Sequence, residues 1–148
     1  MIEAARLGIS ASDLGHIEAL ARAALPYEAC GLLVGLPARP EDPTTRVTQV
    51  IESANLAAPA ARDRFEIDPK LQFATLRELR GKSEAIIGVY HSHPNGRSEP
   101  SPRDLADAND PGLIWLVTGM PEVGPPTTRA FVLTAATDRF HEIPIETA

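Results

Sequence analysis

Apolar side chains change their spacing along the chain from helical to strand-like, and this alternation predicts an α/β fold. Residues 12–25 repeat apolar positions at helical spacing, and residues 30–35 form a continuous apolar run that is typical of a buried strand. This order of elements suits a sheet packed between helices. The remaining predicted strands are 46–52, 85–91, 113–117, 128–134 and 139–145, and the remaining helices are 69–80 and 102–108.

Two segments between the strands predicted at 46–52 and 85–91 differ in character. Residues 54–62 are rich in alanine and proline and have no clear period, so we expect an irregular segment that borders the functional site. In the helix predicted at 69–80, Phe73, Leu76 and Leu79 repeat at a spacing of three.

Length, composition and charge are those of a small globular protein. The chain has 148 residues, of which 43% are hydrophobic and 23% charged, so we expect a single domain over 1–148. A net charge of −6 without a Lys/Arg cluster argues against nucleic acid or an anionic membrane as the main partner. The absence of a long apolar stretch or a secretory signal pattern predicts a cytoplasmic location. Oligomeric state is left open, a homodimer included.

The cysteine content excludes an intrachain disulfide and argues against a cysteine nucleophile. Cys30 is the only cysteine, so no intrachain disulfide can form. We expect its thiol to act as a small buried hydrophobe rather than as a nucleophile.

Candidate metal chemistry is concentrated where the strand predicted at 85–91 ends. His91 and His93 are two residues apart, so both side chains point the same way if the strand continues through them. Ser101 is a good helix N-cap, and Asp104 falls in the first turn of the helix that follows. Two imidazoles and one carboxylate give three protein ligands and leave a fourth position for water, which is the composition of a catalytic zinc site.

Each part of this pattern also has an ordinary structural explanation. Ser-x-x-Asp is a common capping pattern, and Asp104 taken alone would be a helix cap. The two remaining histidines lack such a context. His16 falls on the polar side of the first helix, and we expect it to be a solvated surface residue. His141 falls on a closing strand, and we expect it to be structural or exposed. The combination of a His-x-His strand end with an aspartate at the next helix start is what favours a metal site.

At this point the sequence resembles a known family. The run from His91 to Asp104 matches the His-x-His-Pro-x5-Pro-Ser-x-x-Asp motif of the JAB1/MPN/Mov34 (JAMM) zinc metalloproteases with no position missing. Pro26 to Leu33 follows the Pro-x-Glu-x-Cys-Gly-x-Leu pattern of small bacterial members, and Asn55 to Pro69 is similar to the stretch that such members carry between the two motifs. The resemblance covers roughly residues 12–140.

The resemblance implies a fold and a role for each motif residue. His91, His93 and Asp104 would bind Zn²⁺, Glu28 would act as general base and then general acid, and Ser101 would help to stabilise the oxyanion. The implied fold is a three-layer-like α/β sandwich around a curved, mixed sheet flanked by helices, as in cytidine-deaminase-like proteins.

The resemblance also implies a substrate class. Family members hydrolyse isopeptide or peptide bonds after the C-terminal Gly-Gly of ubiquitin or a ubiquitin-like protein. Small bacterial members resemble enzymes that act on sulfur-carrier proteins in sulfur transfer or cysteine biosynthesis, which is the leading hypothesis here. We expect residues 54–66 and 95–100 to wall a groove in which the tail lies extended, paired with a strand edge by β-augmentation.

Two alternatives remain at this stage, and a third is argued against by the cysteine content. One is a desampylase-like deconjugase or a small peptidase with an unrelated substrate, and another is a scaffold of the MPN type that has no activity. A zinc deaminase would need a Pro-Cys-x-x-Cys pair, which a chain with one cysteine lacks.

Overall fold

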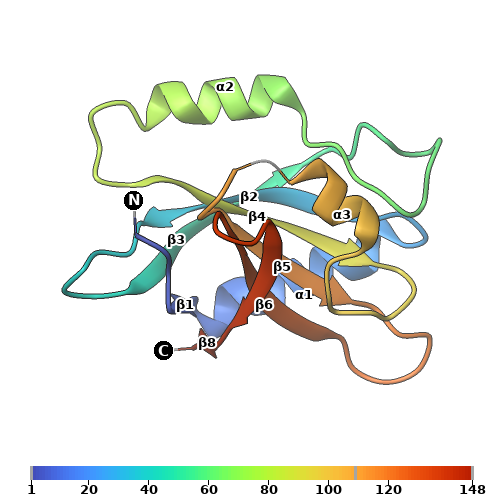
Figure 1. The fold of residues 1–148 in the computed structure, drawn as a ribbon. Helices are drawn as coiled ribbons and strands as arrows, with labels where there is room; N and C mark the ends of the chain where they lie inside the picture. The colour runs from blue at the N-terminus through green and yellow to red at the C-terminus, as the bar shows by residue number, and fades with distance from the viewer. Residues whose placement is uncertain (1, 109, 148) are drawn as a thin grey trace.

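The structure is a computed structural model that describes residues 2–108 and 110–147. In this part of the chain there are eight strands and three α-helices (Figure 1). In chain order they are β1 (Arg6–Gly8), α1 (Ala11–Ala24), β2 (Cys30–Leu36), β3 (Thr44–Ser53), α2 (Pro69–Glu78), β4 (Ala85–His93), α3 (Pro102–Asp107), β5 (Ile114–Gly119), β6 (Thr127–Thr134), β7 (Arg139–Ile143) and β8 (Ile145–Glu146).

All of these strands belong to one curved, mixed sheet. Its order is β7-β6-β5-β4-β2-β3-β1-β8, with parallel pairing between β4 and β5, β1 and β3, and β1 and β8. The strands β7 and β8 lie at opposite ends of this order, although only Pro144 separates them in the chain. The sheet therefore curls until it is nearly closed, which confirms the predicted curved, mixed sheet.

Helices lie on both faces of the sheet (Figure 1). A separate apolar cluster lies on each face, between the sheet and the helix that packs there. On one face Ile17 of α1 packs with Leu33, and on the other Leu71 of α2 packs against the cluster that holds Leu32 and Trp115. Leu32 and Leu33 are neighbours on β2, and they enter different clusters because strand side chains alternate between faces. Replacing a wholly buried leucine such as these by alanine typically costs ~2–5 kcal/mol.

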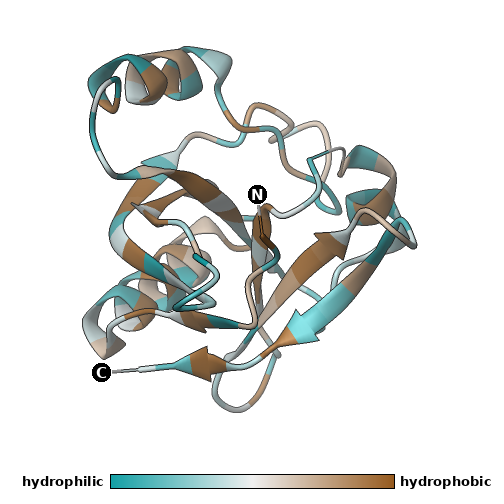
Figure 2. Cartoon of the chain, turned by 60° about the vertical axis from the view of Figure 1, so that its left-hand side comes forward, coloured by the Kyte–Doolittle hydropathy of each residue, from teal (hydrophilic) through white to brown (hydrophobic). Residues whose placement is uncertain are grey.

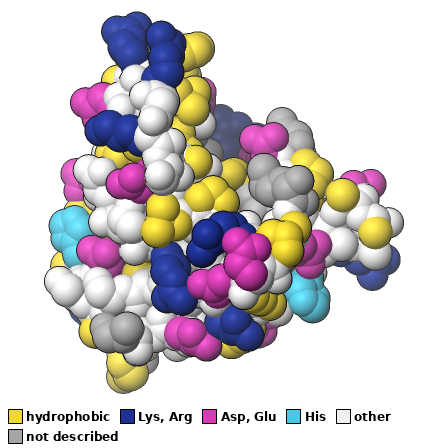
Figure 3. All heavy atoms as spheres, turned by 90° about the vertical axis from the view of Figure 1, so that its left-hand side faces the viewer, with side chains coloured by type: hydrophobic (Ala, Val, Ile, Leu, Met, Phe, Trp, Pro, Cys, Tyr) yellow, Lys and Arg dark blue, Asp and Glu magenta, His cyan; other side chains and the backbone are white. Residues whose placement is uncertain are grey.

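The helix α2 turns much of its apolar surface toward solvent. Thr75 is buried and its hydroxyl donates to the Leu71 carbonyl, whereas Phe73 and Leu76 are 69% and 55% exposed. Figure 2 shows the helix standing apart from the sheet, and basic and apolar side chains gather at the top of the face in Figure 3, where α2 lies. A spacing of three marked the helix correctly without indicating which of its faces is buried.

Predictions for single residues outside the motif hold. His16 and His141 are exposed, and Cys30 is 2% exposed within the sheet. Across the described residues, no helix combines the length and the apolar character needed to span a membrane.

The elements differ from the predicted ones at the two ends of the chain. The short strand β1 has no counterpart in the predicted set, and the strand expected at 139–145 is divided into β7 and β8 at Pro144. Proline cannot donate to a sheet ladder, which explains the break.

Candidate metal centre and active site

The strand β4 delivers both histidines to one face of the sheet. It runs through His93, so the condition for His91 and His93 to point the same way is met. In the sheet His91 lies between Cys30 of β2 and Val117 of β5, and both histidines are at least 96% buried. The two imidazoles are therefore held by a central strand rather than by a mobile loop.

The helix α3 brings the carboxylate to the same place. It lies in the connection between the parallel strands β4 and β5, so its N-terminus faces the end of β4. The Ser101 hydroxyl accepts a hydrogen bond from the Asp104 backbone N–H at 3.0 Å, and the Ser101 N–H donates to Asp104 Oδ2 at 2.8 Å. This capping box fixes both the start of the helix and the direction of the carboxylate.

Three side-chain atoms converge to within a few tenths of an ångström of the spacing that tetrahedral zinc would give them. His91 Nε2 lies 2.9 Å from Asp104 Oδ2 and 3.1 Å from His93 Nε2, and His93 Nε2 lies 3.1 Å from the same Oδ2. Zinc with bonds of about 2.0–2.1 Å and tetrahedral angles would hold its ligand atoms roughly 3.3 Å apart. The donor set and its spacing therefore fit zinc.

Neighbouring groups orient the two rings in different ways. His93 Nδ1 lies 3.0 Å from the carbonyl oxygen of Arg97, to which it donates, so that Nε2 of the neutral ring keeps its lone pair. The His91 ring stacks on Phe65 with centroids 4.4 Å apart and meets the edge of Trp115. His91 Nδ1 is buried without a hydrogen-bond partner among the described residues, so aromatic packing holds this ring in place.

Glu28 joins the cluster because the segment before β2 is tied to β4. The Ala29 N–H donates to the Ser92 hydroxyl at 2.8 Å, and the Ser92 N–H donates to the Ala29 carbonyl at 3.0 Å. One ligand atom each from Glu28, His91, His93 and Asp104 all lie within 4.8 Å of one another. Glu28 is 2% exposed, and its Oε1 has no hydrogen-bond partner in the described chain. A buried carboxylate of this kind suits a proton carrier rather than a structural link.

Burial and charge set the protonation of the cluster. Burial raises the pKa of Glu28 to about 8. The charge of His93 opposes this rise, and the charges of Asp104 and Asp63 add to it. Burial lowers the pKa of His91, which keeps that ring neutral and able to bind a metal ion. Burial alone would raise the pKa of Asp104, but its contacts with His91 and His93 hold it well below the usual range. A divalent cation here would also favour the ionised form of Glu28.

The family model for prokaryotic homologues of the JAB domain matches residues 10–134. The chain belongs to this family. The assignment confirms the resemblance that the motif indicated.

Similar proteins of known sequence and structure agree with this assignment. A desampylase from Haloferax volcanii is 31% identical over 106 residues, which are 72% of each chain. A probable TtuB-protein conjugate cleaving protease from Thermus thermophilus is 32% identical over 83 residues, which are 56% of this chain and 50% of that one. A solved protein from Desulfitobacterium hafniense matches with a TM-score of 0.81 at 29% identity, covering 96% of this chain and 92% of that one. A solved protein from Salinibacter ruber matches with a TM-score of 0.69 at 26% identity, covering 95% of this chain and 91% of that one.

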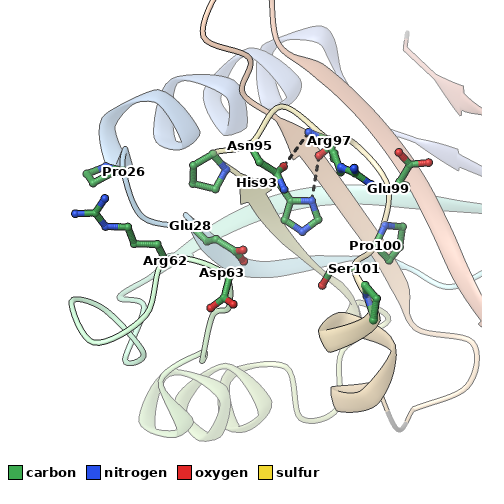
Figure 4. A pocket seen from close by; sticks show the side chains of 12 residues that line it. Pro26, Glu28, Arg62, Asp63, His93, Asn95, Arg97, Glu99, Pro100 and Ser101 are labelled. Atoms are coloured by element: carbon green, nitrogen blue, oxygen red, sulfur yellow. Dashed lines mark hydrogen bonds between the residues drawn. The ribbon is translucent and has the colours of Figure 1, made fainter.

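In this JAB-domain homologue the cluster opens onto a groove of about 630 Å³ (Figure 4). Glu28 and His93 lie on its floor, Arg62 and Asp63 form one wall, and residues between 94 and 102, Ser101 among them, form the other. These walls coincide with the segments that were predicted to border a substrate tail. Four of the five predicted site residues thus lie together, and Ser101 lines the groove beside them.

Asn55 holds one wall of the groove against Glu28, a positioning role that the family resemblance of the stretch from Asn55 to Pro69 did not predict. Its Nδ2 donates to the carbonyl oxygens of Glu28 at 3.1 Å and Arg64 at 3.3 Å. Its Oδ1 accepts from the backbone N–H groups of Ala57 at 2.9 Å and Glu66 at 3.0 Å. One amide side chain therefore fixes the position of the 55–66 loop relative to the general-base candidate.

Asn55→Ala is expected to lower turnover by about 10² while the bound metal is retained, because a displacement near 1 Å at a reacting group can cost that much. Cleavage rate and metal content of the same preparation measure the two effects. Gln49→Ala, at an exposed position on β3, is the matched control. Unchanged turnover in the Asn55 variant would show that the loop does not position Glu28.

Proposed function

We propose that this protein is a zinc-dependent peptidase or isopeptidase that hydrolyses the amide bond at the C-terminal Gly-Gly of a ubiquitin-like or sulfur-carrier protein. The observation that carries the proposal is the convergence of Glu28 with His91, His93 and Asp104 from segments far apart in sequence. We assign zinc binding to the two histidines and the aspartate. A cytoplasmic location stays a prediction.

The arrangement divides the reaction among few groups. Zinc at such a site acidifies a water molecule toward a pKa of ~7 and polarises the substrate carbonyl. The Glu28 carboxylate accepts the proton of the attacking water and then donates it to the leaving nitrogen as the C–N bond breaks. Ser101 lines the groove, and its hydroxyl proton is free to donate to the developing oxyanion while its oxygen accepts from the helix.

The relatives support the proposed substrate class. One is named a desampylase and another a probable TtuB-protein conjugate cleaving protease, so both names describe removal of a protein from a conjugate. A Gly-Gly tail suits the groove because glycine lets the backbone approach the floor closely. Within this class we favour a sulfur carrier as the substrate, with a role in sulfur transfer or cysteine biosynthesis.

The proposed specificity is tested with a β-grasp carrier protein that ends in Gly-Gly followed by one further residue. Its cleavage by the zinc-loaded protein is compared with that of the same carrier carrying Ala-Ala in place of Gly-Gly. We expect release of the last residue only from the Gly-Gly form. Equal rates on both carriers would contradict the proposed specificity, and the Glu28→Gln variant provides the inactive control.

Ser101→Ala is expected to reduce kcat by ~10²–10³ if the hydroxyl donates to the oxyanion. The loss of the helix cap adds a fall of ~1 kcal/mol in the free energy of unfolding. Steady-state kinetics and denaturant unfolding separate the two effects. A change in stability with kcat unaltered would leave Ser101 as a helix cap alone.

A further inference from the structure

Two adjacent side chains of opposite charge line the groove beside Glu28. Asp63 lies close to the Glu28 carboxylate and contributes to raising its pKa, whereas Arg62 extends away from it along the same wall (Figure 4). The guanidinium carbon of Arg62 lies 5.8 Å from the centroid of the Tyr27 ring. Within residues 2–108 and 110–147, Arg62 forms no ion pair.

Hydrogen bonds and an aromatic contact fix the position of this wall. Asn55 bonds to the backbone of Ala57 before this wall and of Arg64 after it, as well as to Glu28. The Tyr27 ring supports the guanidinium from one side. A guanidinium held over an aromatic ring keeps its N–H groups at the edges, where they can donate to an anion. Arg62 is therefore a cation without an acidic partner, oriented at the rim of the groove.

The proposed reaction places the leaving group on this side. Glu28 donates a proton to the leaving nitrogen, so that nitrogen must come within hydrogen-bond reach of the Glu28 carboxylate. Chain atoms that follow the nitrogen then continue past Glu28, where Arg62 and Asp63 form the wall. Ser101, which would donate to the oxyanion, lies on the opposite wall.

We infer that Arg62 binds the free α-carboxylate of the leaving group, which is a single amino acid at the end of the carrier rather than a lysine side chain of a second protein. The inference rests on the proposed function. In the hydrolysis, oxygen from water bonds to the acyl carbon, the C–N bond breaks, and the nitrogen receives the proton from Glu28. The released amino acid carries an ammonium and a carboxylate, which match Asp63 and Arg62 respectively. A lysine isopeptide places no carboxylate there.

Three substrates made from one carrier protein test the inference. The first ends in Gly-Gly-Ala with a free carboxylate, the second is the same chain as its terminal carboxamide, and the third joins Gly-Gly to the Nε of a lysine peptide. We expect the zinc-loaded protein to favour the free acid over the other two by ~10–100-fold in kcat/KM, as a charge-assisted hydrogen bond allows. Arg62→Gln should remove this preference by slowing only the free acid, mainly through KM.

Arg77→Gln, on the exposed side of α2, is the matched control and should keep the preference. Binding of the acid and the amide to the Glu28→Gln variant gives the same comparison without turnover. Equal wild-type rates on acid and amide, a lysine conjugate cleaved as fast as the acid, or a preference that survives Arg62→Gln would each overturn the inference while leaving the hydrolase function intact. If Arg97→Gln, rather than Arg62→Gln, removed the preference for the free acid, the residue that binds the carboxylate would lie on the opposite wall. Failure to cleave any of the three would overturn the proposed function itself.

Discussion

Glu28→Gln is expected to lower kcat/KM for Gly-Gly cleavage by about 10²–10⁴ while leaving the bound zinc in place. The carboxamide has nearly the same shape, and Glu28 Oε1 has no hydrogen-bond partner in the described residues that the change would disrupt. What is lost is the ability to accept a proton from water and return it to the leaving nitrogen. Kinetics and elemental analysis on one preparation measure both quantities.

Glu78→Gln on the exposed surface of α2 makes the same chemical change away from the groove and should be without effect. Full activity in Glu28→Gln would remove this residue from the mechanism. A variant that lost zinc together with activity would instead make Glu28 a fourth ligand, a role that its position within 4.8 Å of the other three ligand atoms permits.

Removal of the metal by a chelator is expected to abolish turnover and to lower the thermal unfolding midpoint. His91, His93 and Asp104 lie buried with their ligand atoms 2.9–3.1 Å apart, so a metal ion binds the folded chain far better than the unfolded one. Zinc at 100 times its Kd would stabilise the fold by about 2.7 kcal/mol. For a domain of this size that corresponds to a midpoint shift of roughly 5–10 °C.

Calorimetry before and after chelation, followed by return of Zn²⁺ or Mg²⁺, measures this linkage. Zinc should restore both the midpoint and the activity, whereas magnesium should restore neither, because it prefers oxygen ligands in an octahedron. Activity that survives complete removal of zinc would contradict metal-dependent hydrolysis.

Local spacing was sufficient to predict three of the four residues that cluster in the site. The period of two in a strand placed His91 and His93 on one face, and the cap signals at Ser101 started a helix with Asp104 in its first turn. Each inference needed only neighbours in sequence. The strand and helix order likewise predicted most elements, because their apolar patterns are long enough to carry a period.

Contacts between distant segments could not be predicted in this way. Glu28 reaches the histidines only because β2 pairs with β4 and Ser92 binds the segment ahead of β2, and neither contact leaves a local trace in the sequence. The family pattern around Glu28, rather than periodicity, pointed to it. Asn55 and Phe65 were missed as positioning residues because a single amide or ring in an irregular stretch looks the same whether or not it holds a catalytic wall.

If this JAB-domain homologue is a zinc enzyme, freshly purified protein should contain zinc. Elemental analysis of the wild type and of Asp104→Ala is the measurement, because Asp104 Oδ2 contacts both histidine Nε2 atoms. We expect about one zinc per wild-type chain and almost none in the variant. No zinc in the wild type, even after the metal is added back, would contradict zinc-dependent hydrolysis and favour a scaffold without activity.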